Sequence, residues 1–144
     1  MSTSQTSTQK TRILADKFVE YVSTTRYEDA YRLLNEDGQF VLTGQTPVSG
    51  VYKGLEDIFA RLAPALSGYT ERPTIVFSDI IVDGDKAFLR ASGIGKATHG
   101  VYKQPYYGYY LRAEGDGLAE IIEYFDPFQI ESAFFGKKLV DSSE

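Results

Sequence analysis

The sequence predicts an α+β fold in which helices come first and a curved antiparallel sheet follows. Apolar residues recur at helical spacing as far as residue 68, and beyond residue 70 they alternate as they do in strands. Asp83-Gly84 and Asp116-Gly117 supply hairpin turns between the alternating segments. Helices followed by a meander favour α+β architecture over a parallel sheet with crossovers. A curled sheet closed by helices would enclose a pocket at one end.

The first predicted helix carries Leu14, Phe18, Tyr21 and Val22 at helical spacing. All eight residues before it, from 2 to 9, are Ser, Thr or Gln, which is typical of a disordered tail. We therefore expect a tail over residues 1–9 and one domain over residues 10–140. A chain of 144 residues is the usual size of a single domain.

Two further helices are expected. Thr25 and Glu28 have capping-box spacing, so a second helix should begin there and continue through Leu34. The third, over residues 55–66, keeps strict core-facing spacing, and Pro64 should bend its last turn. The predicted strands are residues 39–43, 74–82, 86–96, 101–114 and 118–127.

The composition excludes several classes of site. Without cysteine there can be no disulfide, thiol nucleophile or zinc finger, and one histidine excludes multi-histidine metal sites. An all-carboxylate metal site stays formally open, but we expect neither a metal nor another cofactor. The net charge of −5, with no basic cluster, argues against nucleic acid or an anionic membrane as a partner. No secretory signal or membrane span is visible, so we expect a cytoplasmic protein.

One acid interrupts an otherwise apolar strand face. In the last strand, Ala119, Ile121, Glu123 and Phe125 share a side. A buried carboxyl group must be paired, hydrogen-bonded or kept protonated by a raised pKa, and the last condition suits acid–base chemistry near neutral pH. Glu123 is therefore a candidate catalytic residue. The alternatives are a structural acid paired with an inward cation, or a reversed face assignment.

Arg90 is the most plausible cationic partner for Glu123, but its strand argues against that pairing. Ala87, Leu89 and Ala91 form the smoother face, which should point inward. Arg90 would then point to solvent or to a subunit interface, and a structural role is the favoured interpretation.

Tyrosines are concentrated in the strand at residues 101–114. Alternation puts Tyr107 and Tyr109 on one face, with Tyr106 and Tyr110 on the other. The inward pair could hydrogen-bond a substrate carbonyl or stack on a flat ring. The alternative is that most of them serve as core or interface residues, since aromatic side chains favour strands.

His99 lies in a glycine-rich turn and is a second catalytic candidate, placed near a pocket rim. A histidine in such a turn is more often only a loop residue. Tyr21, Phe59 and Phe125 complete the set of residues expected to contact substrate. The glycine-rich stretch at residues 50–54 lacks phosphate-loop spacing and predicts no nucleotide site.

Five short motifs occur in a characteristic order. They are Gly-Val-Tyr-Lys-Gly at 50–54, Ile-Val-Asp-Gly-Asp at 81–85, Gly-Ile-Gly-Lys at 93–96, Thr-His-Gly at 98–100 and Ile-Ile-Glu-Tyr-Phe-Asp at 121–126. Over residues 10–135 this arrangement resembles the nuclear-transport-factor-2-like (NTF2-like) superfamily, and within it the SnoaL-like polyketide cyclase group. The resemblance implies a cone-shaped fold with three N-terminal helices packed on a curved antiparallel sheet around a deep apolar pocket. It also implies a homodimer formed through the outer sheet face.

The resemblance selects the same acid as the face assignment. In the similar phenazine-biosynthesis A/B proteins, the glutamate that matches Glu123 is a pocket acid, and limonene epoxide hydrolase has an aspartate there. Other elements of those sites are missing. The third helix has Arg61 where the phenazine proteins have a histidine, and Arg90-Ala91-Ser92 lacks the second acid of the epoxide hydrolase. The strand at residues 40–43 lacks the aspartate of the steroid isomerase branch.

Three functions remain open. The first is a cofactor-independent enzyme, in the range from isomerase and cyclase to lyase and hydrolase, acting on a small apolar metabolite in a biosynthetic pathway. Glu123 would transfer the proton, Tyr107 and Tyr109 would orient the substrate, and His99 would assist. The second is a non-catalytic small-molecule binding protein on the same fold. A protein-interaction scaffold that uses the outer aromatic face is a third possibility.

Overall fold

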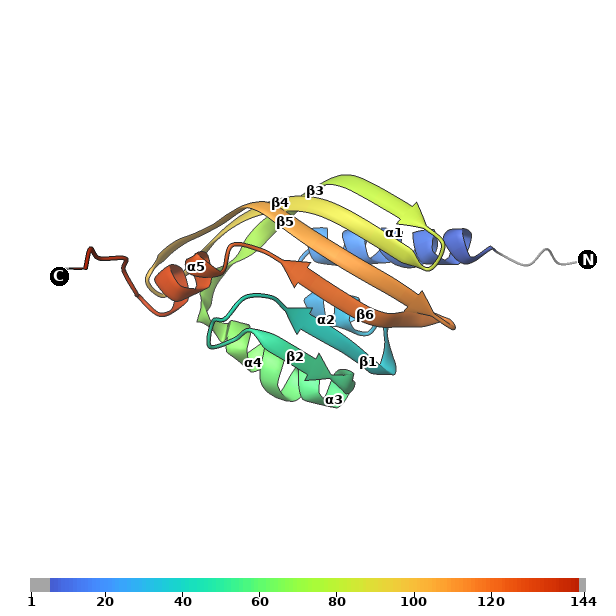
Figure 1. Cartoon of the computed structure of the whole chain (residues 1–144), viewed down its shortest axis with the longest axis horizontal. Coiled ribbons are helices and arrows are strands. Elements are labelled where there is room, and N and C mark those ends of the chain that lie inside the picture. Colours follow the sequence, from blue (N-terminus) through green and yellow to red (C-terminus); the bar gives the residue numbers. More distant parts are fainter. Residues whose placement is uncertain (1–5, 143–144) are drawn as a thin grey trace, which may run out of the picture.

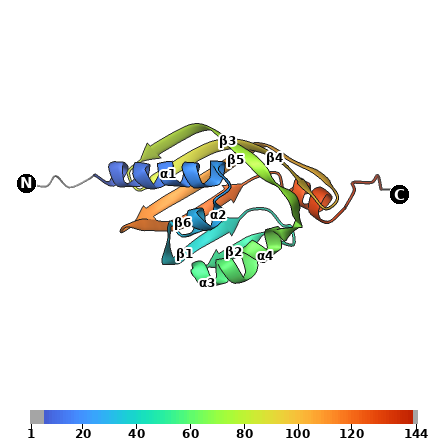
Figure 2. The ribbon, with the colours of Figure 1, turned by 180° about the vertical axis from the view of Figure 1, so that it is seen from behind.

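A curved sheet of six strands wraps around a group of helices. The computed structural model describes residues 6–142 of the chain. The strands are β1 (Leu34–Leu42), β2 (Gly50–Lys53), β3 (Tyr69–Asp83), β4 (Lys86–Ala97), β5 (Gly100–Glu114) and β6 (Gly117–Tyr124). The helical segments are α1 (Ser7–Ser23), α2 (Tyr27–Tyr31), α3 (Gly54–Asp57), η1 (Ile58–Leu62), α4 (Ala63–Ala65), η2 (Leu66–Gly68), α5 (Pro127–Gln129) and η3 (Ile130–Phe134). Figures 1 and 2 show the two broad sides of the molecule.

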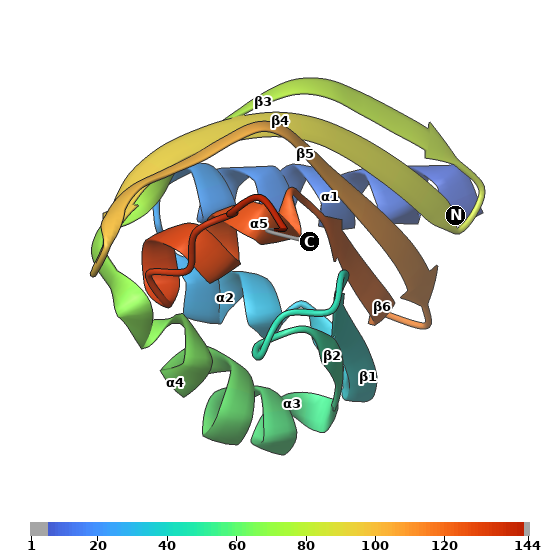
Figure 3. The same cartoon turned by 60° about the vertical axis from the view of Figure 1, so that its left-hand side comes forward.

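The strand order is β2-β1-β6-β5-β4-β3. Neighbouring strands are antiparallel except β1 and β6, which run parallel. The predicted α+β fold is therefore confirmed, but the sheet is mixed rather than wholly antiparallel. The parallel pair arises because the chain crosses from β2 through helices α3 to η2 and three long strands before β6 returns beside β1. In Figure 3, β3, β4 and β5 arch over α1, with α2 and α3 below.

The first helix begins at Ser7, earlier than the domain start at residue 10 that the composition predicts. Thr6 and Gln9 form a capping box, in which the Thr6 side chain accepts from the Gln9 N–H and the Gln9 side chain accepts from the Thr6 N–H. A segment of Ser, Thr and Gln can thus start a helix as well as form a tail. The rest of the predicted tail, residues 1–5, lies outside the described residues.

The predicted cap of the second helix is wrong. Thr25 closes α1 instead: it has a φ of 61°, and the Arg26 N–H donates back to the Tyr21 carbonyl at 2.7 Å, as at the end of many helices. Helix α2 is only five residues long. Leu34, assigned to its apolar stripe, begins β1, where buried and more exposed positions alternate from Gly38 to Leu42.

The third predicted helix spans α3 to η2, with a wider π-helical turn at Ile58–Leu62 just before Pro64. Irregular turns of this kind accommodate a proline, which has no N–H to donate. The glycine-rich entry to this helix forms β2, a strand that alternation did not reveal because it has only four residues.

The predicted strand faces are confirmed. In β4, Ala87, Leu89 and Ala91 are buried and face the helices, whereas Arg90 is exposed and pairs with Asp79 at 3.2 Å. The core lies between this inner face and α1, whose Phe18 packs edge-on against the ring of Tyr109.

Candidate functional site

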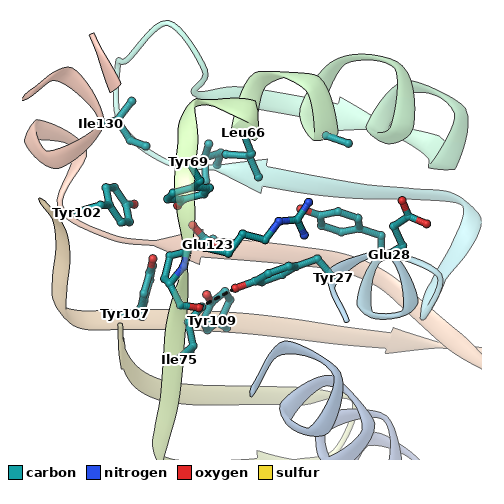
Figure 4. A pocket seen from close by; sticks show the side chains of 15 residues that line it. Tyr27, Glu28, Leu66, Tyr69, Ile75, Tyr102, Tyr107, Tyr109, Glu123 and Ile130 are labelled. Atoms are coloured by element: carbon teal, nitrogen blue, oxygen red, sulfur yellow. Dashed lines mark hydrogen bonds between the residues drawn. The ribbon is translucent and has the colours of Figure 1, made fainter. Parts of the chain in front are cut away.

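A cavity opens between the inner face of the sheet and helices α2, α4 and η2. It offers about 80 Å³ to the centres of water-sized molecules. One water needs roughly 10–15 Å³ by this measure, so the space suits a compound of about one ring. Six of the lining side chains are tyrosines: Tyr27, Tyr31, Tyr69, Tyr102, Tyr107 and Tyr109. In Figure 4 the tyrosines that are labelled lie around Glu123.

Glu123 occupies the centre of the sheet. Its strand, β6, lies between β1 and β5, where Leu42 and Tyr109 are its direct partners. Burial raises the pKa of the Glu123 carboxyl group to about 7, and a hydrogen bond from the Tyr109 hydroxyl limits this rise. The Glu123 side chain lines the cavity, and the residue is partly exposed. At neutral pH this group therefore exists in comparable amounts as acid and as base, which suits proton transfer.

The surrounding phenols stay protonated. Burial, the largest cause, and the negative charge of Glu123 together raise the pKa of Tyr27 and that of Tyr102 to about 12. The pKa values of Tyr69, Tyr107 and Tyr109 lie well above the usual range for the same main reason. The tyrosines of the cavity therefore present Glu123 with neutral hydroxyl groups.

Gln104 fixes the direction of one of these hydroxyl groups. Its Oε1 accepts from the Asp126 N–H at 2.8 Å, so its Nε2 must be the donor to the Asp126 carbonyl at 2.9 Å and to the Tyr102 hydroxyl oxygen at 3.1 Å. Because Tyr102 accepts from Gln104, its own proton has to be donated elsewhere. The neighbours of that hydroxyl on the cavity side are Tyr69 and Tyr107. Tyr102 can thus donate to an oxygen atom placed in the cavity.

The mouth of the cavity carries two opposite charges, on Glu28 and Arg72, and both side chains are exposed. The Arg72 guanidinium lies 5.2 Å from the centre of the Tyr27 ring. The Tyr27 hydroxyl donates to the Pro73 carbonyl at 3.2 Å, which holds α2 against β3 (Figure 4). The remaining lining is mostly aliphatic, from Leu42, Leu66, Ile75 and Ile130 among others.

Three of the predicted site residues come together here. Glu123, Tyr107 and Tyr109 all line the cavity, and the rings of the two tyrosines stack with their centres 5.6 Å apart. The strand alternation placed these three side chains correctly.

His99 does not line the cavity. It is exposed in the β4–β5 turn, where its N–H donates to the Ala133 carbonyl at 2.8 Å and its ring lies against Gly136. The turn carries it to the outside of the C-terminal segment, so the predicted assistance to Glu123 has no geometric support.

The predicted substrate contacts Tyr21, Phe59 and Phe125 also lie outside the lining. Arg26 covers the Tyr21 ring at 4.6 Å, near the end of α1. Phe59 packs behind Tyr31, with ring centres 6.1 Å apart. Phe125 packs against the core beyond the end of β6. All three residues pack against the core, and none of them forms part of the cavity surface.

The sequence interpretation missed Tyr27, Tyr31, Tyr69, Tyr102 and Arg72. Tyr27 and Tyr31 are four residues apart and so share one helix face, a signal that was available. Tyr102 was concealed by an irregularity in β5. Gly93 pairs with Gln104 whereas Ala91 pairs with Tyr107, so the strand has an extra residue and its inward positions change from even to odd numbers.

Among residues 6–142, no three His, Asp or Glu side chains are close enough together to hold a metal ion. No helix in the same part of the chain is long and apolar enough to span a membrane.

Comparison with known proteins identifies the fold. The chain matches no protein-family model and no curated protein sequence. An NTF2-like protein of unknown function from Burkholderia pseudomallei superimposes with a TM-score of 0.75 at 11% identity, covering 87% of this chain and 97% of that one. A putative SnoaL-like polyketide cyclase from Jannaschia sp. CCS1 gives 0.72 at 12% identity and covers 96% and 100%. TerC, co-crystallised with polyporic acid, gives 0.73 at 12% identity and covers 88% and 98%. The chain thus has the NTF2-like fold that the motif order predicts.

Proposed function

We propose that this protein is a cofactor-independent enzyme that moves a proton within a small, flat, apolar carbonyl compound, with Glu123 as the acid–base group. One observation carries the proposal. The Glu123 carboxyl group lies in a cavity lined mostly by phenols and aliphatic side chains, and its pKa is raised to about 7. A group that titrates near the working pH can both accept and return a proton.

In the proposed reaction, the Glu123 carboxylate removes a proton from the carbon next to the substrate carbonyl. The electron pair of that C–H bond moves onto the carbonyl oxygen and gives an enolate. Gln104 donates to the Tyr102 hydroxyl oxygen, so the Tyr102 proton is free to form a hydrogen bond with this enolate oxygen. Where the substrate has a carbon–carbon double bond conjugated with this enolate, protonated Glu123 returns the proton to the far end of that double bond. The double bond then moves by one position, and the product is an isomer. Tyr107 and Tyr109 hold the ring against the sheet.

The comparisons agree with this reaction class without selecting a substrate. One protein of the same fold is described as a putative SnoaL-like polyketide cyclase, and another was crystallised with polyporic acid. A cyclase or isomerase on this fold would be consistent with a biosynthetic role. The second candidate is a small-molecule binding protein, which the tyrosine-lined cavity would serve equally well with Glu123 as a ligand contact.

Deuterium exchange distinguishes the two candidates without the natural substrate. The protein is incubated with 2-cyclohexenone in D₂O, and loss of the proton signals next to the carbonyl is followed by NMR. General acid–base catalysis contributes about a hundredfold or more to rate, so the wild type should exceed Glu123→Gln by about that factor. Equal rates for the two proteins, with binding still visible in the protein spectrum, would support the binding function instead.

We also propose a homodimer formed through the outer face of the sheet. Val76, Ile94 and Val101 are about 60% exposed there, on three neighbouring strands. Apolar patches of this kind are typical of subunit interfaces.

A further inference from the structure

Arg72 is directed to the cavity by an irregularity in its strand. In β3, Glu71 pairs with Lys96 and Thr74 pairs with Ile94, so two residues of β3 oppose one of β4 between these pairs. Such bulges redirect side chains and are common beside functional sites. The cation reaches the mouth although its strand neighbour Glu71 points toward Lys96, with 3.7 Å between the charged atoms.

The guanidinium is available to a ligand. Within residues 6–142, no carboxylate oxygen lies within 4.0 Å of the Arg72 nitrogens. The guanidinium carbon lies over the Tyr27 ring, 5.2 Å from the ring centre. That ring is itself fixed, because the Tyr27 hydroxyl is bound to the Pro73 carbonyl. The guanidinium is planar, and its parallel N–H donors match the two oxygens of a carboxylate.

The two charges at the mouth do not act equally on the interior. The charge of Arg72 lowers the pKa values of Tyr27 and Tyr31, partly against burial, whereas Glu28 contributes to neither. Figure 4 places Glu28 at the edge of the cluster, beyond the Tyr27 ring. The charge of Glu123 raises the pKa values of the same two tyrosines. Tyr27 and Tyr31 therefore experience both the Arg72 cation and the buried carboxyl group, and all four residues line the same cavity.

We infer that the ligand of this cavity is a compact, flat compound that is apolar except for one carboxylate, and that Arg72 binds this carboxylate at the mouth while the apolar ring lies among the tyrosines. The inference rests on the function proposed for the cavity. It adds the chemical class of the substrate and a residue that selects it. The reacting end of such a compound would face Glu123, because the carboxylate fixes which end enters first.

Three matched probes test the charge preference. Benzoate, benzamide and benzylamine have similar sizes, and their binding is measured by NMR titration of the protein. A hydrogen-bonded ion pair contributes enough for about a tenfold preference, so benzoate should bind about tenfold more tightly than benzamide. Benzylamine should bind more weakly than either. Equal binding of the three probes, absence of benzoate binding, or a preference for benzylamine would overturn the inference.

Two arginine variants locate the effect. Arg72→Gln should remove the preference for benzoate and leave benzamide binding unchanged. Arg90→Gln is the matched control, since Arg90 is similarly exposed but lies on the outer face paired with Asp79. If Arg72→Gln keeps the wild-type preference, Arg72 is not the carboxylate-binding residue. Thermal unfolding of both variants confirms that they remain folded.

The same samples separate this inference from the proposed function. The Glu123 carboxyl group is titrated by carbon NMR in each. A titration near pH 7 without a benzoate preference would refute the anion site and leave the acid–base function standing. A benzoate preference with an ordinary Glu123 titration would do the reverse.

Discussion

Tyr109 stands directly across from Glu123 in the pairing of β5 with β6, and hydrogen bonding by its hydroxyl group lowers the pKa of the Glu123 carboxyl group. This contact opposes the effect of burial, because it stabilises the charged form of the acid. The pKa of Glu123 therefore reflects two opposing influences, of which burial is the larger. The pairing of β5 with β6 keeps the Tyr109 hydroxyl group beside the buried carboxyl group.

Replacing Tyr109 with phenylalanine should raise the pKa of Glu123 above its value of about 7. The variant loses the donor to the carboxylate and leaves the apolar surroundings in place. Carbon NMR titration of the glutamate carboxyl signals measures the change. Tyr107→Phe is the matched control, because its ring is stacked beside Tyr109 but does not donate to Glu123. If both variants shift the titration equally, the effect comes from general polarity and not from this hydrogen bond.

Glu123 should make the protein less stable as the pH rises. Its pKa increases from 4.5 to about 7 on folding, so between these values the folded state binds more protons than the unfolded state. The contribution to stability is complete below pH 4.5 and is lost as the pH rises through 7. The free energy of unfolding should fall by up to about 3 kcal/mol across this window. Denaturant unfolding at pH 5 and pH 8 measures it.

Glu123→Gln is the comparison for this pH dependence. The amide does not titrate, so the variant should lose the decrease and should be more stable than the wild type at pH 8. The wild type and Glu123→Gln are also compared with His99→Gln added to both. This substitution removes the single histidine of the chain, so no imidazole titrates in the comparison. A wild type whose stability follows that of Glu123→Gln across the window would show that Glu123 is charged in the folded protein with an ordinary pKa.

Gln104 is wholly buried and joins β5 to the chain after β6 through Asp126, in addition to orienting Tyr102. Gln104→Leu should lower the free energy of unfolding by about 2 kcal/mol or more, since it leaves backbone groups of Asp126 without partners. Tyr102→Phe removes only the hydroxyl group and should cost about 1 kcal/mol. Denaturant unfolding compares the two. Equal costs would mean that the bonds to Asp126 contribute little.

The sequence predicted the parts of the site that depend on regular alternation. Glu123 interrupts an apolar face of β6. In a regular strand, the face on which a side chain lies depends only on whether its residue number is odd or even. Tyr107 and Tyr109 follow from the same parity in β5. The order of helices and strands also followed from the change of period near residue 70. These features are local properties of the chain, so a single sequence contains them.

The parts that were missed depend on irregular or long-range structure. The extra residue in β5 reverses its parity and hides Tyr102 and Gln104, and the bulge in β3 directs Arg72 to the mouth. Neither irregularity has a clear sequence signal. His99 was misplaced because its position depends on how the C-terminal segment packs beside the β4–β5 turn. The parallel pairing of β1 with β6 joins residues about 80 positions apart and has no local signal.

The proposed homodimer predicts that a charge on the outer sheet face will separate the subunits. Ile94 is 58% exposed at the centre of that face, between Thr74 of β3 and Lys103 of β5. Ile94→Asp should convert a dimer to a monomer in sedimentation velocity, because a buried unpaired carboxylate is costly at an interface. Leu139→Asp is the control, since Leu139 is 82% exposed in the C-terminal segment, away from the sheet. A wild type that sediments as a monomer, or an Ile94→Asp variant that remains dimeric, would contradict this interface. The Glu123 titration should be the same in both variants, because Ile94 points away from the cavity on the opposite face of β4.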